Sequence, residues 1–202
     1  MGSRLELGSF CNVPMIQPYV VGGCTTTLEA RELMKETFAD FLITDDCPEA
    51  GSGIALAKEF RHVKTLVLTY RENAELVREA EEAGVDGLVF RSAIGLSGEG
   101  SFLMAMERIA KGGVWLSPAV TCIVGNADTD ALALVGLLTQ SERKVLALLS
   151  KGLDNQEIAN DPSVMTSLET TKSHLRGIRE KFGPDYSDRV RLALLGLRAG
   201  LT

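Results

Sequence analysis

The chain has 202 residues and a formal net charge of −6, with 45% hydrophobic and 24% charged residues. This composition excludes wholesale disorder, and the length suits two domains of unequal size that each bury a core. The longest apolar stretch, 131–138, is far shorter than the roughly 20 residues of a membrane helix, and no signal segment is visible. We therefore expect a folded, cytoplasmic protein without a membrane partner.

Metal and catalytic motifs are absent from the sequence. Cys11, Cys24, Cys47 and Cys122 follow no C-x-x-C spacing, and only two histidines are available. We find no Gly-rich phosphate loop and no pairing of a nucleophile with a base. We expect free thiols, no metal or cofactor, and no enzymatic activity.

Short apolar runs alternate with amphipathic segments between residues 18 and 112, a pattern typical of βαβ units around a parallel sheet. The pattern predicts strands at 19–22, 41–44, 65–69 and 87–90. It predicts helices at 27–37, 52–60, 73–83 and 100–111, with Gly84 and Gly112 at helix C-termini.

Segments 41–53, 66–69 and 84–91 resemble the receiver domain of two-component response regulators, and 112–118 resembles the segment after its last helix. The resemblance implies an α/β receiver-like, flavodoxin-like fold with a parallel sheet. Residues 1–17 are too few for a full first strand and first helix, so we expect the first strand to be missing.

The resemblance also indicates what phosphorylation chemistry is lost. A working receiver needs an acidic pair for magnesium, a phosphoacceptor aspartate, a hydroxyl and a lysine. Aligning Pro48 with the family's proline puts Thr44 at the acceptor position, Thr69 at the hydroxyl and Arg91 at the lysine. A hydroxyl cannot form an acyl phosphate, and a cation without clustered carboxylates lacks ligands. We expect a receiver that is not phosphorylated on aspartate.

Asp45 and Asp46 leave an alternative open, because one of them could rotate into the pocket. In a rival register they form the acidic pair of a first strand, with 64–70 as the second; too little chain then remains for the other strands. We favour their assignment to a loop before Pro48 that caps a helix. The degenerate receiver pocket is thus predicted to contain Thr44, Asp45, Asp46, Thr69 and Arg91.

The predicted division is a receiver-like domain at 1–118, a linker at 119–137 with a hinge at 126–130, and a helical domain at 138–202. Residues 1–137 carry 11 Lys/Arg against 19 Asp/Glu, whereas 138–202 carry 10 against 8. DNA phosphates attract the second part and repel the first.

Three capping patterns open three helices in the C-terminal part: Thr139 with Glu142, Asp154 with Glu157, and Thr166 with Glu169. The third helix has one apolar stripe, formed by Leu168, Thr171, Leu175, Ile178 and Phe182. Its outward side bears Ser173 and Gly177, with Lys172 and Arg176 on one edge and His174 and Lys181 on the other. Such a helix fits the major groove of DNA.

Residues 138–202 resemble the four-helix DNA-binding domain of LuxR/NarL-type regulators. The family pattern is met by Leu138, Thr139, Glu142, Gly152, Asn155, Glu157, Ile158, Ala159, Ser167, Thr170, Lys172, His174, Ile178 and Lys181. The resemblance implies base contacts from Lys172, Ser173 and Arg176 and a phosphate contact from Thr170. His174 and Lys181 complete the predicted DNA-binding set. The chain departs from the family pattern at two places. Thr171 stands where the family prefers valine, and the turn 161–166 is about two residues longer than usual.

Ser187 is predicted to cap a last helix, 188–199, that Gly200 ends. This helix is apolar over much of its circumference, so we expect one flank to pair with a second copy through Val190, Leu194 and Leu197. By resemblance, receivers also pair through the face that corresponds to 73–90.

The sequence therefore predicts a sequence-specific DNA-binding transcriptional regulator that binds double-stranded DNA as a homodimer and works without phosphotransfer. Two alternatives remain: a response regulator phosphorylated on Asp45 or Asp46, and an adaptor that binds another regulatory protein instead of DNA. The longer turn motivates the adaptor.

Overall fold

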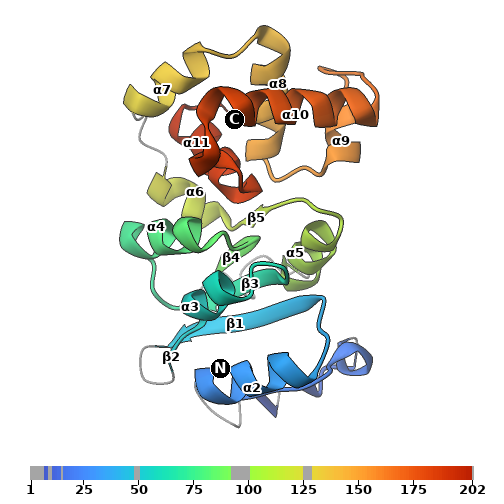
Figure 1. Ribbon diagram of the computed structural model, residues 1–202, viewed down its shortest axis with the longest axis vertical. Helices are drawn as coiled ribbons and strands as arrows, with labels where there is room; N and C mark the ends of the chain where they lie inside the picture. The colour runs from blue at the N-terminus through green and yellow to red at the C-terminus, as the bar shows by residue number, and fades with distance from the viewer. Residues whose placement is uncertain are drawn as a thin grey trace.

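The computed structural model describes residues 7–8, 11–14, 16–47, 51–91, 101–124 and 129–201. Figure 1 shows an elongated molecule with an α/β part at the N-terminal end and a helical part at the C-terminal end. The predictions for residues 126–128 and for much of 1–17 concern residues outside these ranges. Cys11, Cys24 and Cys122 are free thiols, as expected.

The α/β part contains one five-stranded sheet with the order β2-β1-β3-β4-β5. Strands β1 (Phe41–Cys47), β3 (Lys64–Thr69), β4 (Gly87–Phe90) and β5 (Trp115–Leu116) run parallel, and β2 (Gly51–Ser52) pairs antiparallel with the end of β1. The parallel arrangement predicted from the sequence is confirmed for four strands, and the antiparallel β2 makes the sheet mixed.

The strand predicted at 19–22 is wrong. Gln17–Tyr19 forms a short 3-10 helix (η1) with Pro18 near its start, and residues 20–24 have no regular structure. Proline has no amide hydrogen for a strand ladder, and nearby Gly22 packs directly against Leu33. None of the described residues before Phe41 belongs to a strand.

The order of the strands decides between the two registers of the receiver-like sheet. In the flavodoxin-like order 2-1-3-4-5 the first strand lies between the second and third, whereas the third, fourth and fifth are successive neighbours. Here β3 lies between β1 and β4. Strands β1, β3 and β4 therefore correspond to the third, fourth and fifth strands of that order. The register in which Asp45 and Asp46 form the acidic pair of a first strand is wrong.

Helices cover both faces of the sheet. Helices α3 (Gly53–Glu59) and α4 (Ala74–Ala83) lie on one face and α5 (Ser101–Ala110) on the other, while α2 (Thr27–Glu36) lies beyond the β1 edge. Because successive strand residues point to opposite faces, Leu66 and Leu68 pack with the α5 side and Val67 packs with the α3 and α4 side.

The helical part begins inside the predicted linker. Helices α6 (Pro118–Val124) and α7 (Thr129–Gly136) precede α8 (Gln140–Ser150), α9 (Asn155–Asn160), α10 (Leu168–Phe182), the 3-10 helix η3 (Pro184–Tyr186) and α11 (Arg189–Arg198). Among the described residues, no single helix is long and apolar enough to cross a membrane. Only the pair α6 and α7, bent by 97° relative to each other, has the combined length and composition of a membrane span. The domain limits themselves stay a prediction.

The hydrophobic interior continues from the α/β part into the helical part. One hydrophobic cluster runs from α3 and α4 through Val120 of α6 and Ala131 of α7 to α8, α10 and α11. The two parts also touch through their backbones, where Val114 N–H donates to the Gly152 carbonyl over 3.2 Å. A Cβ at Gly152, whose φ is +83°, would lie 2.4 Å from the Val114 carbonyl oxygen, so this contact requires glycine.

Candidate nucleic-acid interface and receiver pocket

The caps that hold α8, α9 and α10 in place are local in sequence. The capping boxes at Thr139 and Asp154 are present as predicted. The third helix differs by one residue: its N-cap is Ser167, whose hydroxyl accepts from Thr170 N–H over 3.0 Å, and not Thr166. The N-terminus of α10 is therefore fixed beside the long turn.

The apolar stripe of α10 faces the core, as the spacing predicts. Leu175, Ile178 and Phe182 are buried and Leu168 is half-buried. Thr171 is fully buried, and its hydroxyl has no hydrogen-bond partner among the described residues. A buried hydroxyl without a hydrogen-bond partner is costly, so an apolar side chain such as valine would fit position 171 better.

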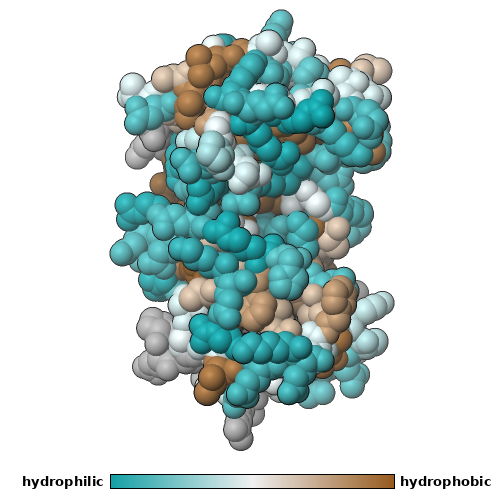
Figure 2. Space-filling model, viewed as in Figure 1, coloured by the Kyte–Doolittle hydropathy of each residue, from teal (hydrophilic) through white to brown (hydrophobic). Residues whose placement is uncertain are grey.

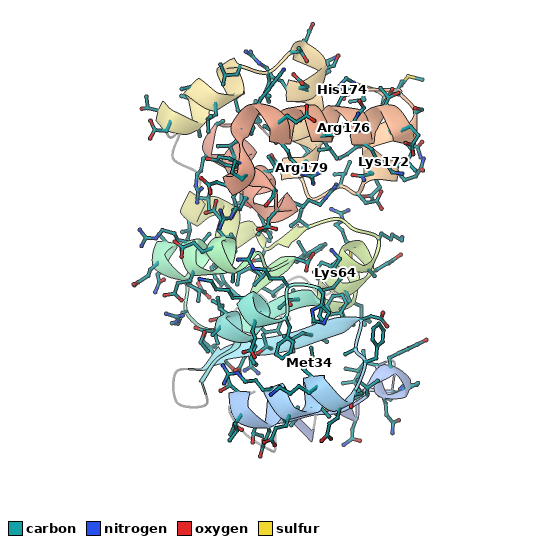
Figure 3. All side chains as sticks on the ribbon, viewed as in Figure 1. Met34, Lys64, Lys172, His174, Arg176 and Arg179 are labelled. Carbon is teal, nitrogen blue, oxygen red and sulfur yellow. The ribbon has the colours of Figure 1, made fainter. Side chains whose placement is uncertain are left out.

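The opposite side of α10 presents its polar residues to solvent. Lys172 and Arg176 keep 51% and 73% of their side chains exposed, and Ser173 is exposed next to them. Figure 3 labels Lys172, His174 and Arg176 along this helix. Lys172 lies 2.8 Å from Glu169 and Arg176 lies 3.9 Å from Glu180. Ion pairs this exposed are weak, so both cations remain available to phosphates or base edges.

Thr170 and His174 lie at the margins of this surface. Thr170 is exposed at the start of α10, with its hydroxyl 2.8 Å from that of Ser167. His174 is half-buried. The exposed surface made by Thr170, Lys172, Ser173 and Arg176 is called the α10 face below.

Lys181 does not belong to the α10 face. Its ammonium lies 2.5 Å from a carboxylate oxygen of Glu142, which is buried at the start of α8 and also accepts from Thr139. Burial opposes ionisation of Glu142, but hydrogen bonds from Lys181 and Thr139 lower the pKa of its carboxyl below the usual value. Lys181 thus ties α10 to α8, and its assignment to DNA contact is not supported by this geometry.

The long turn before α10 is ordered by its own hydrogen bonds. The Asp161 carboxylate accepts from the amide and hydroxyl of Ser163 at 2.8 and 2.6 Å, and Lys144 donates to the Ser163 carbonyl over 3.0 Å. Thr166 N–H donates to the Ala159 carbonyl over 3.0 Å. The insertion therefore leaves α10 as one unbroken helix. The strained position is Met165, with a φ of 40°.

The predicted dimerisation face of α11 is buried within the chain. Val190, Leu194 and Leu197 are 3%, 1% and 6% exposed. They pack in the continuous core because α11 contacts α4, α6 and α7 as well as α8. The helix begins after Asp188 and not at the expected Ser187 cap. In this arrangement the flank of α11 that was predicted to pair with a second copy is not accessible to one.

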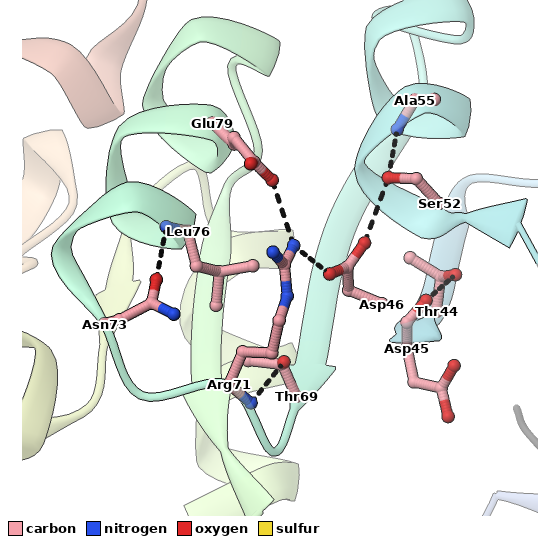
Figure 4. A network of polar contacts seen from close by, with 10 residues as sticks. All are labelled: Thr44, Asp45, Asp46, Ser52, Ala55, Thr69, Arg71, Asn73, Leu76 and Glu79. Atoms are coloured by element: carbon pink, nitrogen blue, oxygen red, sulfur yellow. Dashed lines mark hydrogen bonds and ion pairs between the residues drawn. The ribbon is translucent and has the colours of Figure 1, made fainter. Parts of the chain in front are cut away.

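The five predicted receiver-pocket residues lie at the C-terminal ends of β1, β3 and β4, but Asp45 and Asp46 point to opposite sides of β1 and have different partners. An arginine that the sequence did not reveal pairs with Asp46. Figure 4 shows Arg71, in the loop after β3, between Asp46 and Glu79. Its guanidinium pairs with the Asp46 carboxylate and lies 3.0 Å from Glu79, while Ser52 donates to Asp46 over 3.0 Å. Asp46 is buried, with 3% of its side chain exposed.

Asp45 is buried beside Asp46 and pairs with Arg91 at 3.4 Å. The Arg91 guanidinium also stacks over Tyr70, 4.6 Å from the ring centre. The Thr44 hydroxyl donates to the Asp45 carbonyl over 3.1 Å, and Thr69 accepts from Arg71 N–H over 3.0 Å. Asp45 and Asp46 therefore belong to β1, and their prediction as capping residues of a loop is wrong.

These residues do not fit a magnesium ion. Both carboxylates already have a guanidinium beside them, and no group of three or more His, Cys, Asp and Glu among the described residues is placed to hold a metal. Arg71 and Arg91 place positive charge beside the Asp46 and Asp45 carboxylates.

The fold and the two sites define a response-regulator architecture, a receiver-like α/β domain followed by a helix-turn-helix domain. Residues 136–194 match the family model described as bacterial regulatory proteins, luxR family.

The similarity extends through most of the chain. The response regulator protein VraR of Staphylococcus aureus (strain NCTC 8325 / PS 47) is 26% identical over 174 residues, which cover 86% of this chain and 79% of VraR; VraR of strain COL matches equally. A structure of the response regulator RcsB in complex with DNA has a TM-score of 0.50 and 21% identity, covering 100% of this chain and 96% of RcsB. An RcsB structure from Salmonella typhimurium has a TM-score of 0.50 and 21% identity, covering 96% and 93%. At this identity the two structures bear on the fold alone.

Proposed function

We propose that the protein is a sequence-specific DNA-binding transcriptional regulator that reads a half-site with the α10 face. The observation that carries this proposal is the exposure of Lys172, Ser173 and Arg176 on a helix whose opposite stripe is fixed in the core. Lysine and arginine reach phosphates and guanine edges, and the small Ser173 lets the helix approach the groove. The match of residues 136–194, which include α10, to the luxR family of bacterial regulatory proteins supports this proposal.

A selection from a random duplex pool tests the proposal directly. The full chain should enrich a defined sequence, and its affinity for that sequence should fall steeply with salt because phosphate contacts release counterions. A pool that stays random after repeated selection, with flat salt dependence, would instead favour the adaptor.

We further propose that the receiver-like domain acts without aspartyl phosphorylation. Asp45 and Asp46 are buried and each is paired with a guanidinium, which holds both carboxylates in ion pairs. Incubation with acetyl phosphate and magnesium, followed by intact-mass measurement, should show no added phosphate. A phosphate that disappears in Asp45→Ala or Asp46→Ala would establish the phosphorylated alternative.

The proposed regulator acts in the cytoplasm as a homodimer and not as an enzyme. Two recognition helices would read two half-sites, and discrimination of about 1–3 kcal/mol per base contact would add across them. Because the α11 flank is buried, another surface must pair the copies, or α11 must leave α4. Sedimentation of the free and DNA-bound chain tests the oligomeric state.

A further inference from the structure

A cavity of about 580 Å³ lies where a further strand of the sheet would be expected, between the open edge of β1, helix α2 and residues 16–27. Along residues 41–45, β1 pairs only with β3, and β2 reaches no further than Asp46 and Cys47. A helix and an irregular segment cannot continue the ladder of hydrogen bonds. The space between them and β1 is consequently left unfilled.

Helix α2 closes this space loosely. Ala30 is its one buried residue among those described, and Leu33 and Met34 are half-buried toward the cavity. Figure 3 places Met34 between α2 and β1. Figure 2 shows hydrophobic side chains gathered on this lower part of the molecule, where Tyr19 and Phe38 are 81% and 83% exposed. A water-filled cavity with such walls is unfavourable, so an apolar occupant would gain free energy by displacing the water.

The walls of the cavity select against anions. Their exposed surface is mainly apolar, with Ile16, Ala30, Leu33, Ile43 and Leu56 among the lining residues. Among the described residues that line it there is no lysine, arginine or histidine, and the charged side chains are Asp40 and Asp45. Burial raises the pKa of the Cys24 thiol, so that thiol is neutral at neutral pH.

We propose that this cavity is a binding site for an uncharged, predominantly apolar small molecule. Its volume lies within the range of about 300–1,000 Å³ that is usual for small-molecule sites. A polar group on the ligand would donate to the Thr44 hydroxyl, whose proton is directed at the Asp45 carbonyl, or bond to the open edge of β1. The site goes beyond the proposed DNA-binding function and does not depend on it.

The neutral dye Nile red tests the site in the full chain. We expect saturable binding at one dye per chain, with blue-shifted emission. Ala30→Phe fills the cavity and should weaken binding by about tenfold or more, equivalent to about 1.4 kcal/mol. The matched variant Ala110→Phe places the same ring on the exposed side of α5 and should bind like the wild type. Equal binding by both variants would overturn the proposal.

Thiol protection gives a second test that needs no variant. Cys11 and Cys24 line the cavity, whereas Cys122 is exposed on α6. Saturating Nile red should slow the reaction of Cys11 and Cys24 with N-ethylmaleimide at least severalfold and leave Cys122 unchanged, as read by peptide mass spectrometry. Absence of protection at saturating dye, or equal protection of Cys122, would overturn the site. Neither test contains DNA, so a failure here leaves the DNA-binding proposal standing.

Discussion

Arg198 of α11 donates two hydrogen bonds to the carboxylate of Glu81 on α4, at 3.0 and 2.6 Å. Arg191 of the same helix donates to the Glu81 carbonyl over 3.2 Å, and Arg61 lies 3.6 Å from Asp188. The last helix of the helix-turn-helix domain is thus bound to the receiver-like domain by polar contacts beside the shared apolar core. This contact also covers part of the 73–90 face through which pairing of two copies was expected.

Removing the Glu81 carboxylate should loosen the two domains. Glu81→Gln removes the carboxylate charge that pairs with the partly buried Arg198, and we expect a loss of about 1–3 kcal/mol in the free energy of unfolding. Small-angle scattering should show a larger radius of gyration. The neighbouring Glu82→Gln, at an exposed position, is the control and should behave like the wild type. An unchanged radius in Glu81→Gln would show that the apolar core alone holds the domains together.

Thr171→Val should stabilise the chain. The substitution keeps the shape of the side chain and removes a fully buried hydroxyl that has no partner, so we expect a gain of about 1 kcal/mol, or roughly 2–4 °C in melting temperature. Thr170→Val, at an exposed position whose hydroxyl contacts Ser167, should bring no gain. A lower melting temperature for Thr171→Val would mean that the hydroxyl has a partner.

The Glu142 contact should make stability depend on acid pH. The folded-state pKa of Glu142 is lowered, so its contribution is present above the unfolded pKa of about 4.3 and is lost as the pH falls through the folded value. Glu142→Gln should therefore be less stable than the wild type at pH 7, and the difference should shrink below about pH 4. Glu180→Gln, on the exposed side of α10, serves as the control. A difference that stays constant with pH would rule out an ionic role for Glu142.

The arginine pairs of the receiver pocket should contribute to stability without a metal. Arg71→Ala leaves the buried Asp46 carboxylate without its ionic partner, and we expect a loss of about 3–5 kcal/mol in urea unfolding. Arg78→Ala, on the exposed side of α4, should lose little. Millimolar magnesium should not raise the melting temperature of the wild type. A clear rise would contradict the assignment of the cationic role to Arg71 and Arg91.

Local patterns predicted most of the secondary structure. The strand Gly87–Phe90 and the boxes at Thr139 and Asp154 depend on neighbouring residues and were correctly predicted. The strand at 19–22 failed because a short apolar run beside Pro18 lacks the partner strand that would fix it.

What the sequence could not predict depends on contacts between distant residues. Lys181 and Glu142 are 39 positions apart, and Arg198 and Glu81 are 117 apart. The same applies to the burial of Val190, Leu194 and Leu197: an apolar helix surface shows that something covers it, but not whether the cover is a second copy or the chain's own α4 and α6.

The most direct test of the account is DNA affinity after removal of the two exposed cations of the α10 face. With a duplex selected by the wild type, Lys172→Ala combined with Arg176→Ala should weaken binding by about a hundredfold or more, because each base or phosphate contact contributes about 1–3 kcal/mol. The melting temperature should change little. Lys35→Ala combined with Arg78→Ala removes the same charge from exposed positions of the receiver-like domain and should bind almost like the wild type. Equal affinity of the two double variants would contradict the assignment of α10 as the recognition helix.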